Sequence, residues 1–311
     1  MKILHKSLEG YLSYCQYQKG LNSKTLKSYR IDISQFLDYI DVSPYDISKQ
    51  NIYDFITQLH QQYKPKSIKR KLASIRAFYT YLEYEEMIEN NPFSKIKIKS
   101  NEPFILPRTI PMHIIETILC TAYASKDQDV RNRTEYQYKT TVRDIAILEL
   151  LFATGMRVSE LCSLKFENIN LLDCEIKIYG KGAKERIIQI GNEDVITALK
   201  EYYKLFEEHI EENGSFFINR LNHQLSEQSV RFMIKKYTDM AGISLHITPH
   251  MFRHSFATLL LEEDVDIRYI QKLLGHSSIT TTQIYTHVTS KKQRDILVTK
   301  HPRNKMNVNK G

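Results

Sequence analysis

Residues 248–258 read TPHMFRHSFAT, and the fold of the C-terminal half can be worked out from this stretch. Thr248 suits a helix N-cap and Pro249 suits the first helical turn, so a helix is predicted to begin here. His250 and Arg253 are three residues apart and share one face of that helix. Free backbone N–H groups and the helix dipole make the first turn favourable for an anion such as phosphate. Taken alone, the pair is better explained as ordinary surface residues.

A second motif follows at residues 273–278, which read LLGHSS. Gly275 is expected to close a helix as its C′ residue, and a serine just beyond it can cap the next helix. His276 is thereby held in the tight turn between the two helices. Tyr285 comes nine residues later; it is one of 20 tyrosines and is distinguished only by this context.

A third motif lies upstream at residues 153–161, which read ATGMRVSEL. An apolar helix is predicted to end at Gly155, and Arg157 then opens the next helix. Glu160 stands one turn further on and could orient the guanidinium of Arg157. An isolated arginine here would usually be a surface residue. This motif therefore indicates a functional site only in combination with the other motifs.

A β-hairpin is predicted over residues 175–190. The strand EIKIY at 175–179 alternates, GKGAK at 180–184 makes the turn, and RIIQI at 186–190 returns. Lys181 lies at the tip of this turn. The turn is not a P-loop, because it connects two strands and does not lead into a helix.

The order of these motifs resembles the tyrosine recombinase (phage integrase) family, and most of all its Xer-type site-specific recombinases. The resemblance rests on six residues: Arg157, Lys181, His250, Arg253, His276 and Tyr285. The strings ATGMRVSEL, YGKGAKERIIQI, TPHMFRHSFAT and LLGHSSITTTQIYTHV are similar to the family's motifs. The terminal HPR at 301–303 looks like the ending of Xer-type recombinases.

The resemblance implies that Tyr285 is the nucleophile and that Arg157 and Arg253 clamp the scissile phosphate of DNA. Arginine suits this role because its fork of N–H donors binds phosphate oxygens in pairs and stabilises the additional charge of the pentacoordinate transition state. The phosphotyrosine keeps the bond energy, so rejoining needs no ATP. Because arginines supply the positive charge, no metal ion or other cofactor is expected.

Two proton transfers must accompany this chemistry. A free tyrosine has a pKa of about 10, so a neighbour must take its proton, and His250 is the expected base. The resemblance implies that Lys181 is the general acid, which gives a proton to the leaving 5′ oxygen. It also implies that His276 assists, and a hydrogen bond to a phosphate oxygen would achieve this.

The expected fold class is mainly α. Residues 1–100 read as short amphipathic helices and resemble the family's four-helix, SAM-like core-binding domain, which clamps DNA. Residues 101–311 are expected to form an α+β catalytic domain in which the hairpin provides a small sheet. Residues 125–140 are polar and look like a surface excursion. Helices are predicted at about 47–62, 65–88, 111–124, 141–153, 193–211, 226–241, 249–263 and 266–274.

Positive charge is in excess, with 44 Lys and Arg against 36 Asp and Glu, a net charge of +8 and a pI of about 9.0. This balance mildly favours a polyanionic partner. Residues 55–82 contain no acidic residue, whereas a solvated helix face normally mixes charges of both signs. We therefore expect the basic residues of this stretch to contact the DNA backbone: Lys64, Lys66, Lys69, Arg70, Lys71 and Arg76.

The composition excludes several classes of protein. The 311 residues are 42% hydrophobic and 26% charged, which fits about two globular domains and not a collagen or a coiled coil. The four cysteines show no C-x-x-C spacing, which disfavours a zinc site and a disulfide framework. The N-terminal residues lack the long apolar stretch of a signal peptide, and no apolar run approaches the roughly 18 residues that a membrane helix needs. A cytoplasmic protein without a membrane partner is expected.

The leading interpretation is a site-specific recombinase of double-stranded DNA, Xer-like, which resolves chromosome or plasmid dimers. One alternative is an integrase or excisionase-type recombinase of a phage or mobile element, and another is a type IB topoisomerase-like relaxase. A more distant alternative is a catalytically idle DNA-binding accessory protein, which would not be expected to retain all six residues. No carboxylate cluster suited to two metal ions is apparent, so a nuclease is disfavoured.

Exchange between two duplexes needs four subunits, because each subunit cleaves one strand. A homo- or hetero-tetramer on DNA is therefore expected, and in the second case a sister recombinase joins. The family resemblance suggests that residues 288–300 dock on a neighbouring protomer, with Ile296, Leu297 and Val298 as the apolar contact.

Overall fold

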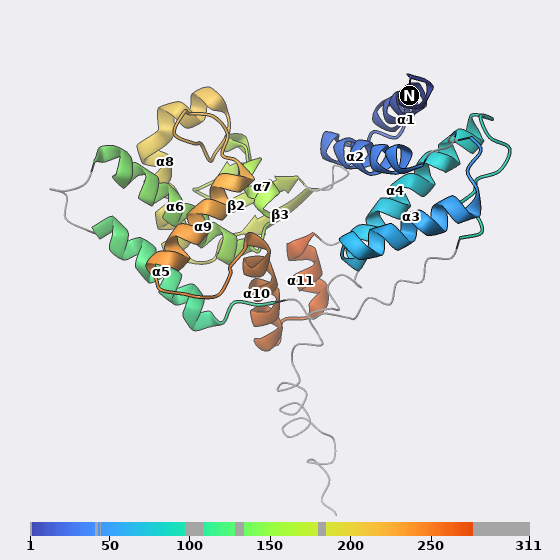
Figure 1. The fold of residues 1–311 in the computed structure, drawn as a ribbon. Helices are drawn as coiled ribbons and strands as arrows, with labels where there is room; N and C mark the ends of the chain where they lie inside the picture. The colour runs from blue at the N-terminus through green and yellow to red at the C-terminus, as the bar shows by residue number, and fades with distance from the viewer. Residues whose placement is uncertain are drawn as a thin grey trace, which may run out of the picture. The chain divides into compact units, whose positions relative to one another are not determined.

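The structure is a computed structural model that describes residues 2–40, 43, 45–96, 108–127, 134–179 and 185–275. The chain divides into two compact units, Met1–Phe104 and Ile105–Gly311, and each is described by itself. Figure 1 shows the helices and strands of both units. None of the helices in the described ranges combines the length and the apolar character that a bilayer-spanning segment requires.

The described residues of the first unit form four helices, as the amphipathic periodicity predicts: α1 (Lys2–Tyr17), α2 (Ser23–Tyr39), α3 (Lys49–Gln62) and α4 (Pro65–Tyr84). Ser48 forms a capping box with Asn51 at the start of α3, and Pro65 occupies the first turn of α4. The helix predicted at 65–88 is shorter than expected, because α4 ends at Tyr84.

An aromatic core holds these four helices together. α4 packs against α1, α2 and α3. The buried ring of Phe36 meets Phe55 edge-on, with 4.9 Å between ring centroids, and meets Phe93 at 5.8 Å. Tyr11 meets Phe78 in the same way at 5.4 Å. Such pairs add to the stabilisation from apolar burial, and they fix which face of α4 is left for solvent.

The second unit combines seven described helices with a small sheet. Its elements are α5 (Met112–Asp127), α6 (Glu135–Thr154), α7 (Val158–Cys162), the 3₁₀ turn η2 (Phe166–Asn168), β1 (Ile169–Asn170), β2 (Glu175–Tyr179), β3 (Glu185–Gln189), α8 (Glu193–Asn213), α9 (Glu227–Met240), α10 (Pro249–Glu262) and α11 (Ile267–Leu274). α6 is central, because it contacts α5, α8, α9 and α10 (Figure 1). Nearly all of its side chains from Val142 to Leu151 are buried. The mainly α fold class with a small antiparallel sheet is confirmed.

The sheet has the order β1-β2-β3 and is antiparallel throughout. β2 and β3 form the predicted hairpin, in which Ile176 pairs with Ile188 and Ile178 pairs with Arg186. The three isoleucines are buried, as the alternation predicts. β1 was not predicted, because two residues are too few to show a period. The hairpin turn at 180–184 lies outside the described residues.

The prediction of a surface excursion over residues 125–140 is wrong at both ends. α5 continues to Asp127, and α6 begins at Glu135. A capping box starts α6. The Thr134 hydroxyl accepts from the Gln137 N–H at 3.2 Å, and the Gln137 side chain accepts from the Thr134 N–H at 3.0 Å. The first turn of α6 is polar and shows no apolar periodicity, so the periodicity of the sequence does not reveal where this helix begins.

Candidate functional site

The described residues include part of the predicted catalytic set: Arg157, Glu160, His250 and Arg253. The remaining predictions lie outside the described residues: Lys181, His276, Tyr285, Ile296, Leu297 and Val298. The described members come from two places in the second unit, the junction between α6 and α7 and the first turn of α10.

A tight turn at Gly155 ends α6 and leads to Arg157 at the start of α7. Gly155 has a φ of +56°, and its N–H closes the last turn of α6 at 3.1 Å, as predicted. A Cβ at this position would lie 2.5 Å from Cδ1 of Phe256 on α10. The glycine therefore lets the end of α6 approach α10, the helix that carries Arg253.

Glu160 is shared by two arginines. Its Oε1 accepts from Nη1 of Arg157 at 2.8 Å, and its Oε2 accepts from the backbone N–H of Arg157 at 2.8 Å. Arg186 of β3 donates from Nη1 to Oε1 at 3.0 Å and from Nη2 to Oε2 at 2.7 Å. The side chains of Glu160 and Arg186 are 6% and 10% exposed, whereas that of Arg157 is 36% exposed. Arg157 is therefore the most accessible of the three.

The carboxyl group of Glu160 is ionised at neutral pH. Burial raises its pKa, but hydrogen bonds from Arg186 and Arg157, together with the charge of Arg186, outweigh burial and hold the pKa below its ordinary value. The carboxylate stands between two guanidinium groups, so this cluster keeps a net positive charge.

Arg253 joins the α6–α7 junction to the end of α11. The residue is 4% exposed. Its Nη1 donates to the carbonyl of Gly155 at 2.8 Å, and its Nη2 donates to the carbonyl of Leu274 at 2.5 Å. Both carbonyls lie at helix C-termini, where the partial negative charge suits a cation. Arg253 thereby links two of the predicted motifs, residues 153–161 and residues 273–278.

Two histidines of α10 are neutral at neutral pH. Partial burial lowers the pKa of His250. The positive charges of Arg253, Arg231 and Arg157 lower this pKa further. His250 lies on α10 three residues before Arg253, whose side chain contacts the Gly155 carbonyl at the α6–α7 junction. Burial lowers the pKa of His254 to about 4, and its neighbours His250 and Arg253 add to the effect. A neutral imidazole can accept a proton, as a general base must.

This arrangement suits a phosphodiester. Arg157 offers an accessible guanidinium, Arg253 a buried one close by, and His250 an exposed, neutral imidazole. The negative charge of Glu160 is neutralised by its hydrogen bonds with Arg157 and Arg186. A bound anion would therefore meet the N–H donors of Arg157 without strong repulsion from this carboxylate. Such surroundings stabilise a phosphate and the additional negative charge of a pentacoordinate transition state.

Sequence reasoning missed Arg186, which completes this cluster. Arg186 and Ile188 are two apart on β3, so they point to the same face of the sheet, and Ile188 is buried. A charged residue on the buried face of a strand is rare unless it is paired. The buried face of the predicted strand could therefore have indicated that Arg186 has a carboxylate partner. Identifying that face required the pairing register of the hairpin.

The basic residues of α4 and its N-cap Lys64, in the first unit, divide by their exposure. Four of those predicted to contact DNA are exposed and carry no carboxylate contact in the described residues: Lys64, Lys66, Lys69 and Arg76. Arg70 pairs with Asp32 of α2, although its side chain is 49% exposed. The basic surface of this helix is therefore smaller than its sequence suggests.

Lys71 is a correction to the predicted DNA-binding set. The residue is 3% exposed, and its Nζ lies 3.2 Å from Oδ1 of Asp32 and 4.6 Å from the ring centroid of Tyr63. A buried ammonium group cannot reach a DNA backbone. Residues 55–82 contain no carboxylate, but α2 supplies one from a distant part of the sequence.

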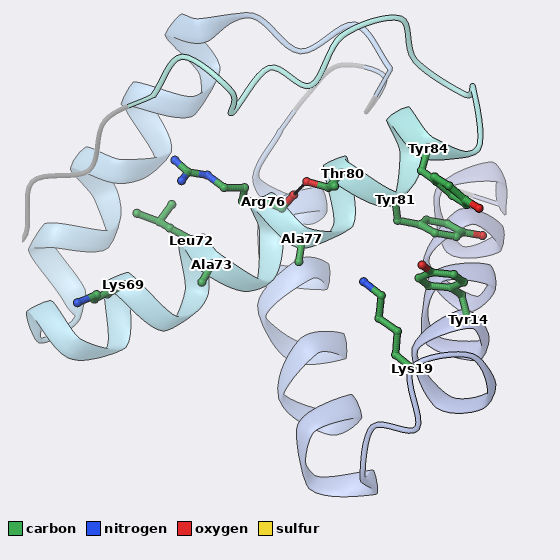
Figure 2. Close-up of a pocket in the computed structure, with 10 residues that line it drawn as sticks. All are labelled: Tyr14, Lys19, Lys69, Leu72, Ala73, Arg76, Ala77, Thr80, Tyr81 and Tyr84. Carbon is green, nitrogen blue, oxygen red and sulfur yellow. Dashed lines mark hydrogen bonds between the residues drawn. The ribbon is translucent and has the colours of Figure 1, made fainter. Parts of the chain in front are cut away.

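A groove of 710 Å³ lies between α1 and α4. Three tyrosine rings gather at one end of it, while its basic residues are Lys19, Lys69 and Arg76 (Figure 2). Nζ of Lys19 lies 5.1 Å from the ring centroid of Tyr14, a cation–π contact. None of the residues lining the groove is acidic, so an anion fits it. Lys19 was not predicted, because it stands in a short turn outside the basic run.

Two family profiles match this chain. The phage integrase family matches residues 127–292, and the phage integrase N-terminal SAM-like domain matches residues 8–86. The two matches correspond to the second and first units respectively. The chain belongs to the phage integrase family, the tyrosine recombinases.

Known relatives agree over nearly the whole length. A tyrosine recombinase of Agathobacter rectalis is 54% identical over 304 residues, which cover 97% of this chain and 98% of that protein. Tyrosine recombinase XerC of Thermodesulfovibrio yellowstonii is 35% identical over 308 residues, which cover 96% and 97%. The predicted resemblance to Xer-type recombinases is confirmed.

Solved structures share the fold. The crystal structure of XerA recombinase aligns with a TM-score of 0.53 at 26% identity and covers 96% of this chain and 99% of that one. XerH site-specific recombinase, bound to a palindromic difH substrate, aligns with a TM-score of 0.73 at 21% identity and covers 94% and 83%. At this identity, the second likeness bears on the fold alone.

Proposed function

We propose that this protein is a site-specific recombinase that cleaves and rejoins strands of double-stranded DNA through a 3′-phosphotyrosine intermediate. The observation that carries the proposal is the convergence of Arg157, His250 and Arg253 around the α6–α7 junction. A site with this charge and a neutral base is suited to phosphoryl transfer. Family membership supports the same reaction.

In the proposed reaction, the hydroxyl oxygen of Tyr285 attacks the scissile phosphorus, and the bond from phosphorus to the 5′ oxygen breaks. His250 takes the tyrosine proton, and Lys181 gives a proton to the leaving oxygen. His276 donates a hydrogen bond to a phosphate oxygen. Rejoining is the reverse: a 5′ hydroxyl attacks the phosphotyrosine, so no ATP is consumed.

The two arginines act on the phosphate in this proposal. Arg157 and Arg253 neutralise the phosphodiester and hold the charge that develops in the transition state. Removal of one such donor typically lowers a rate by about 10²–10³-fold. Glu160 keeps Arg157 in place through its hydrogen bonds.

The first unit would grip the DNA. We assign residues 1–100 to the core-binding domain and 101–311 to the catalytic domain. The proposed backbone contacts are the accessible basic residues of α4 and its N-cap: Lys64, Lys66, Lys69, Arg70 and Arg76. The groove that holds Lys19 extends this basic surface toward α1.

A tetramer on DNA is the proposed assembly. Lambda integrase has been solved as a tetramer bound to a Holliday junction. For this chain, four identical subunits, or two with two of a sister recombinase, would exchange two duplexes in the cytoplasm. A Xer-like role in dimer resolution is favoured, because XerC and XerD proteins match at 35% and 34% identity over nearly their full lengths. Integration or excision of a mobile element is the alternative.

Covalent trapping on a suicide DNA half-site tests the chemistry. The DNA flanking the gene and a fragment library provide substrates that carry a nick near the cleavage position. The wild type is expected to form a DNA adduct on a denaturing gel. Tyr285→Phe should form none yet bind the same DNA in a mobility shift, because only the nucleophilic oxygen is lost.

Two results would contradict the proposal. An adduct that persists in Tyr285→Phe means that another residue is the nucleophile. Tight, sequence-specific binding without any adduct, even after a sister recombinase is added, means that the protein is an idle DNA-binding accessory.

A further inference from the structure

Arg186 of β3 links three elements of the second unit. Its Nη1 and Nη2 donate to the two carboxylate oxygens of Glu160 on α7, at 3.0 Å and 2.7 Å. Its Nε donates to the carbonyl of Leu273 on α11 at 2.9 Å. Each of its three guanidinium nitrogens is engaged within the protein, and its side chain is 10% exposed. The charge of Arg186 is paired with the Glu160 carboxylate through both Nη atoms, so we expect Arg186 to influence a reaction through the residues that it binds.

The first neighbour is Glu160, which Arg186 shares with Arg157. The Arg157 side chain makes one hydrogen bond to Glu160, from Nη1 at 2.8 Å, and stays 36% exposed. Without Arg186, each carboxylate oxygen would lose a guanidinium donor, and Oε2, which accepts from the Arg157 backbone N–H, could accept from the Arg157 side chain as well. A bidentate pair would then draw the Arg157 guanidinium onto the carboxylate, away from a phosphate, and offset its charge.

The second neighbour is the C-terminus of α11. The Leu273 carbonyl that Arg186 binds stands next to the Leu274 carbonyl that Arg253 binds. Gly275 follows with a φ of +63°, and a Cβ there would lie 2.9 Å from Nη1 of Arg186. Two guanidinium groups thus hold this helix end, and the glycine permits the close approach.

We propose that Arg186 is a positioning residue for DNA cleavage. It divides Glu160 between two guanidinium groups, so that Arg157 remains directed to the scissile phosphate, and it fixes the end of α11. The inference rests on the proposed function, because that function places Arg157 on the phosphate. Loss of Arg186 is expected to slow cleavage at unchanged DNA affinity.

A double-mutant cycle in the full chain tests this inference. Arg186→Gln is expected to cleave the suicide half-site about 10²-fold more slowly than the wild type, with a half-site Kd within about threefold. Glu160→Gln combined with Arg186→Gln should cleave at least tenfold faster than the single Arg186 variant, because a neutral amide at position 160 does not capture Arg157. Arg268→Gln, which removes an exposed ion pair with Asp266, is the matched control and should cleave normally.

A labelling measurement reports on Arg157 without any cleavage. Phenylglyoxal modification of Arg157, followed by peptide mass spectrometry, should be several-fold slower in Arg186→Gln and should return to the wild-type rate in the double variant. A single variant that is labelled and cleaves like the wild type overturns the inference. A double variant as slow as the single one also overturns it, and leaves Arg186 a packing residue.

The controls separate this inference from the proposed function. If Arg186→Gln does not fold, Arg186→Lys replaces it in the same cycle, because it keeps a charge and one bond to Glu160 while losing the fork. A wild-type adduct that is absent, or that persists in Tyr285→Phe, contradicts the proposed function. The labelling rates still decide whether Arg186 controls the pairing of Arg157.

Discussion

Gly155 and Gly20 have similar φ angles, +56° and +60°, but different surroundings. In Gly155→Ala, the new Cβ would lie 2.5 Å from Cδ1 of Phe256 in addition to the backbone strain. We expect the free energy of unfolding to fall by about 2–4 kcal/mol. Gly20→Ala has open space around it and should lose only the strain, about 1–2 kcal/mol. Urea denaturation measures both; equal losses would contradict the importance of the Phe256 contact.

His254 makes stability depend on pH. Its pKa in the folded protein is about 4, below the ordinary 6.5, so the unfolded chain binds more protons between these values. The free energy of unfolding should therefore fall as the pH drops from about 6.5 to 4. Allowing for partial solvent screening, we expect a loss of about 1–2 kcal/mol.

Denaturation curves of the wild type and His254→Gln at pH 7.5 and pH 5 measure this dependence. The variant should be less sensitive to acid, because it has no imidazole to protonate. His250 has a lowered pKa too and should leave a residual slope of the same sign. An identical pH slope in both proteins would show that His254 does not contribute.

At the scale of elements, the buried ion pair between Asp32 on α2 and Lys71 on α4 joins these two helices. Asp32 is 1% exposed and also accepts from Ser74 at 3.0 Å. Asp32→Ala leaves the Lys71 ammonium buried without its charge partner, so we expect a loss of about 3–5 kcal/mol of unfolding free energy. Asp32→Leu combined with Lys71→Met removes both charges and should recover most of this loss. A double variant as unstable as the single one would contradict this account.

Some elements follow from their sequences because local signals mark both ends. The predicted helices at 226–241, 249–263 and 266–274 agree within one residue at each end with α9, α10 and α11. Pro249 and Gly275 bound two of them, as expected. The start of α6 and the burial of Lys71 were missed for different reasons. A polar capping box has no period, and an ion pair with Asp32 depends on tertiary contact.

The candidate site was predictable only in part. Motif order directed attention to Arg157, His250 and Arg253, and the structure places these three in one electropositive region. The sharing of Glu160 by two arginines could not be foreseen, because Arg186 is 26 residues away along the chain. Sequence spacing reports neighbours within one helix, whereas this contact needs the fold of the hairpin against α7.

At the scale of the whole molecule, the net charge of +8 predicts salt-dependent DNA binding. Lys66→Ala and Lys69→Ala should each weaken binding similarly on all DNA sequences. Each should reduce the slope of log K against log salt concentration by about 1, because one phosphate contact is lost. Fluorescence anisotropy over a salt series measures these slopes. Lys71→Met is the control: it keeps the pair of Asp32 with Arg70 and should keep the wild-type slope, since Lys71 is buried. A reduced slope in this variant would return Lys71 to the DNA-binding surface.

The contact between Arg186 and Gly275 limits how lineages of this protein can diverge. A methyl group at position 275 would meet the guanidinium of Arg186 at 2.9 Å in a backbone conformation that already disfavours it. Alanine at position 275 therefore requires the Arg186 side chain to move or to be shorter. We therefore expect a substitution at position 275 to be tolerated better when the side chain at position 186 is shorter than arginine.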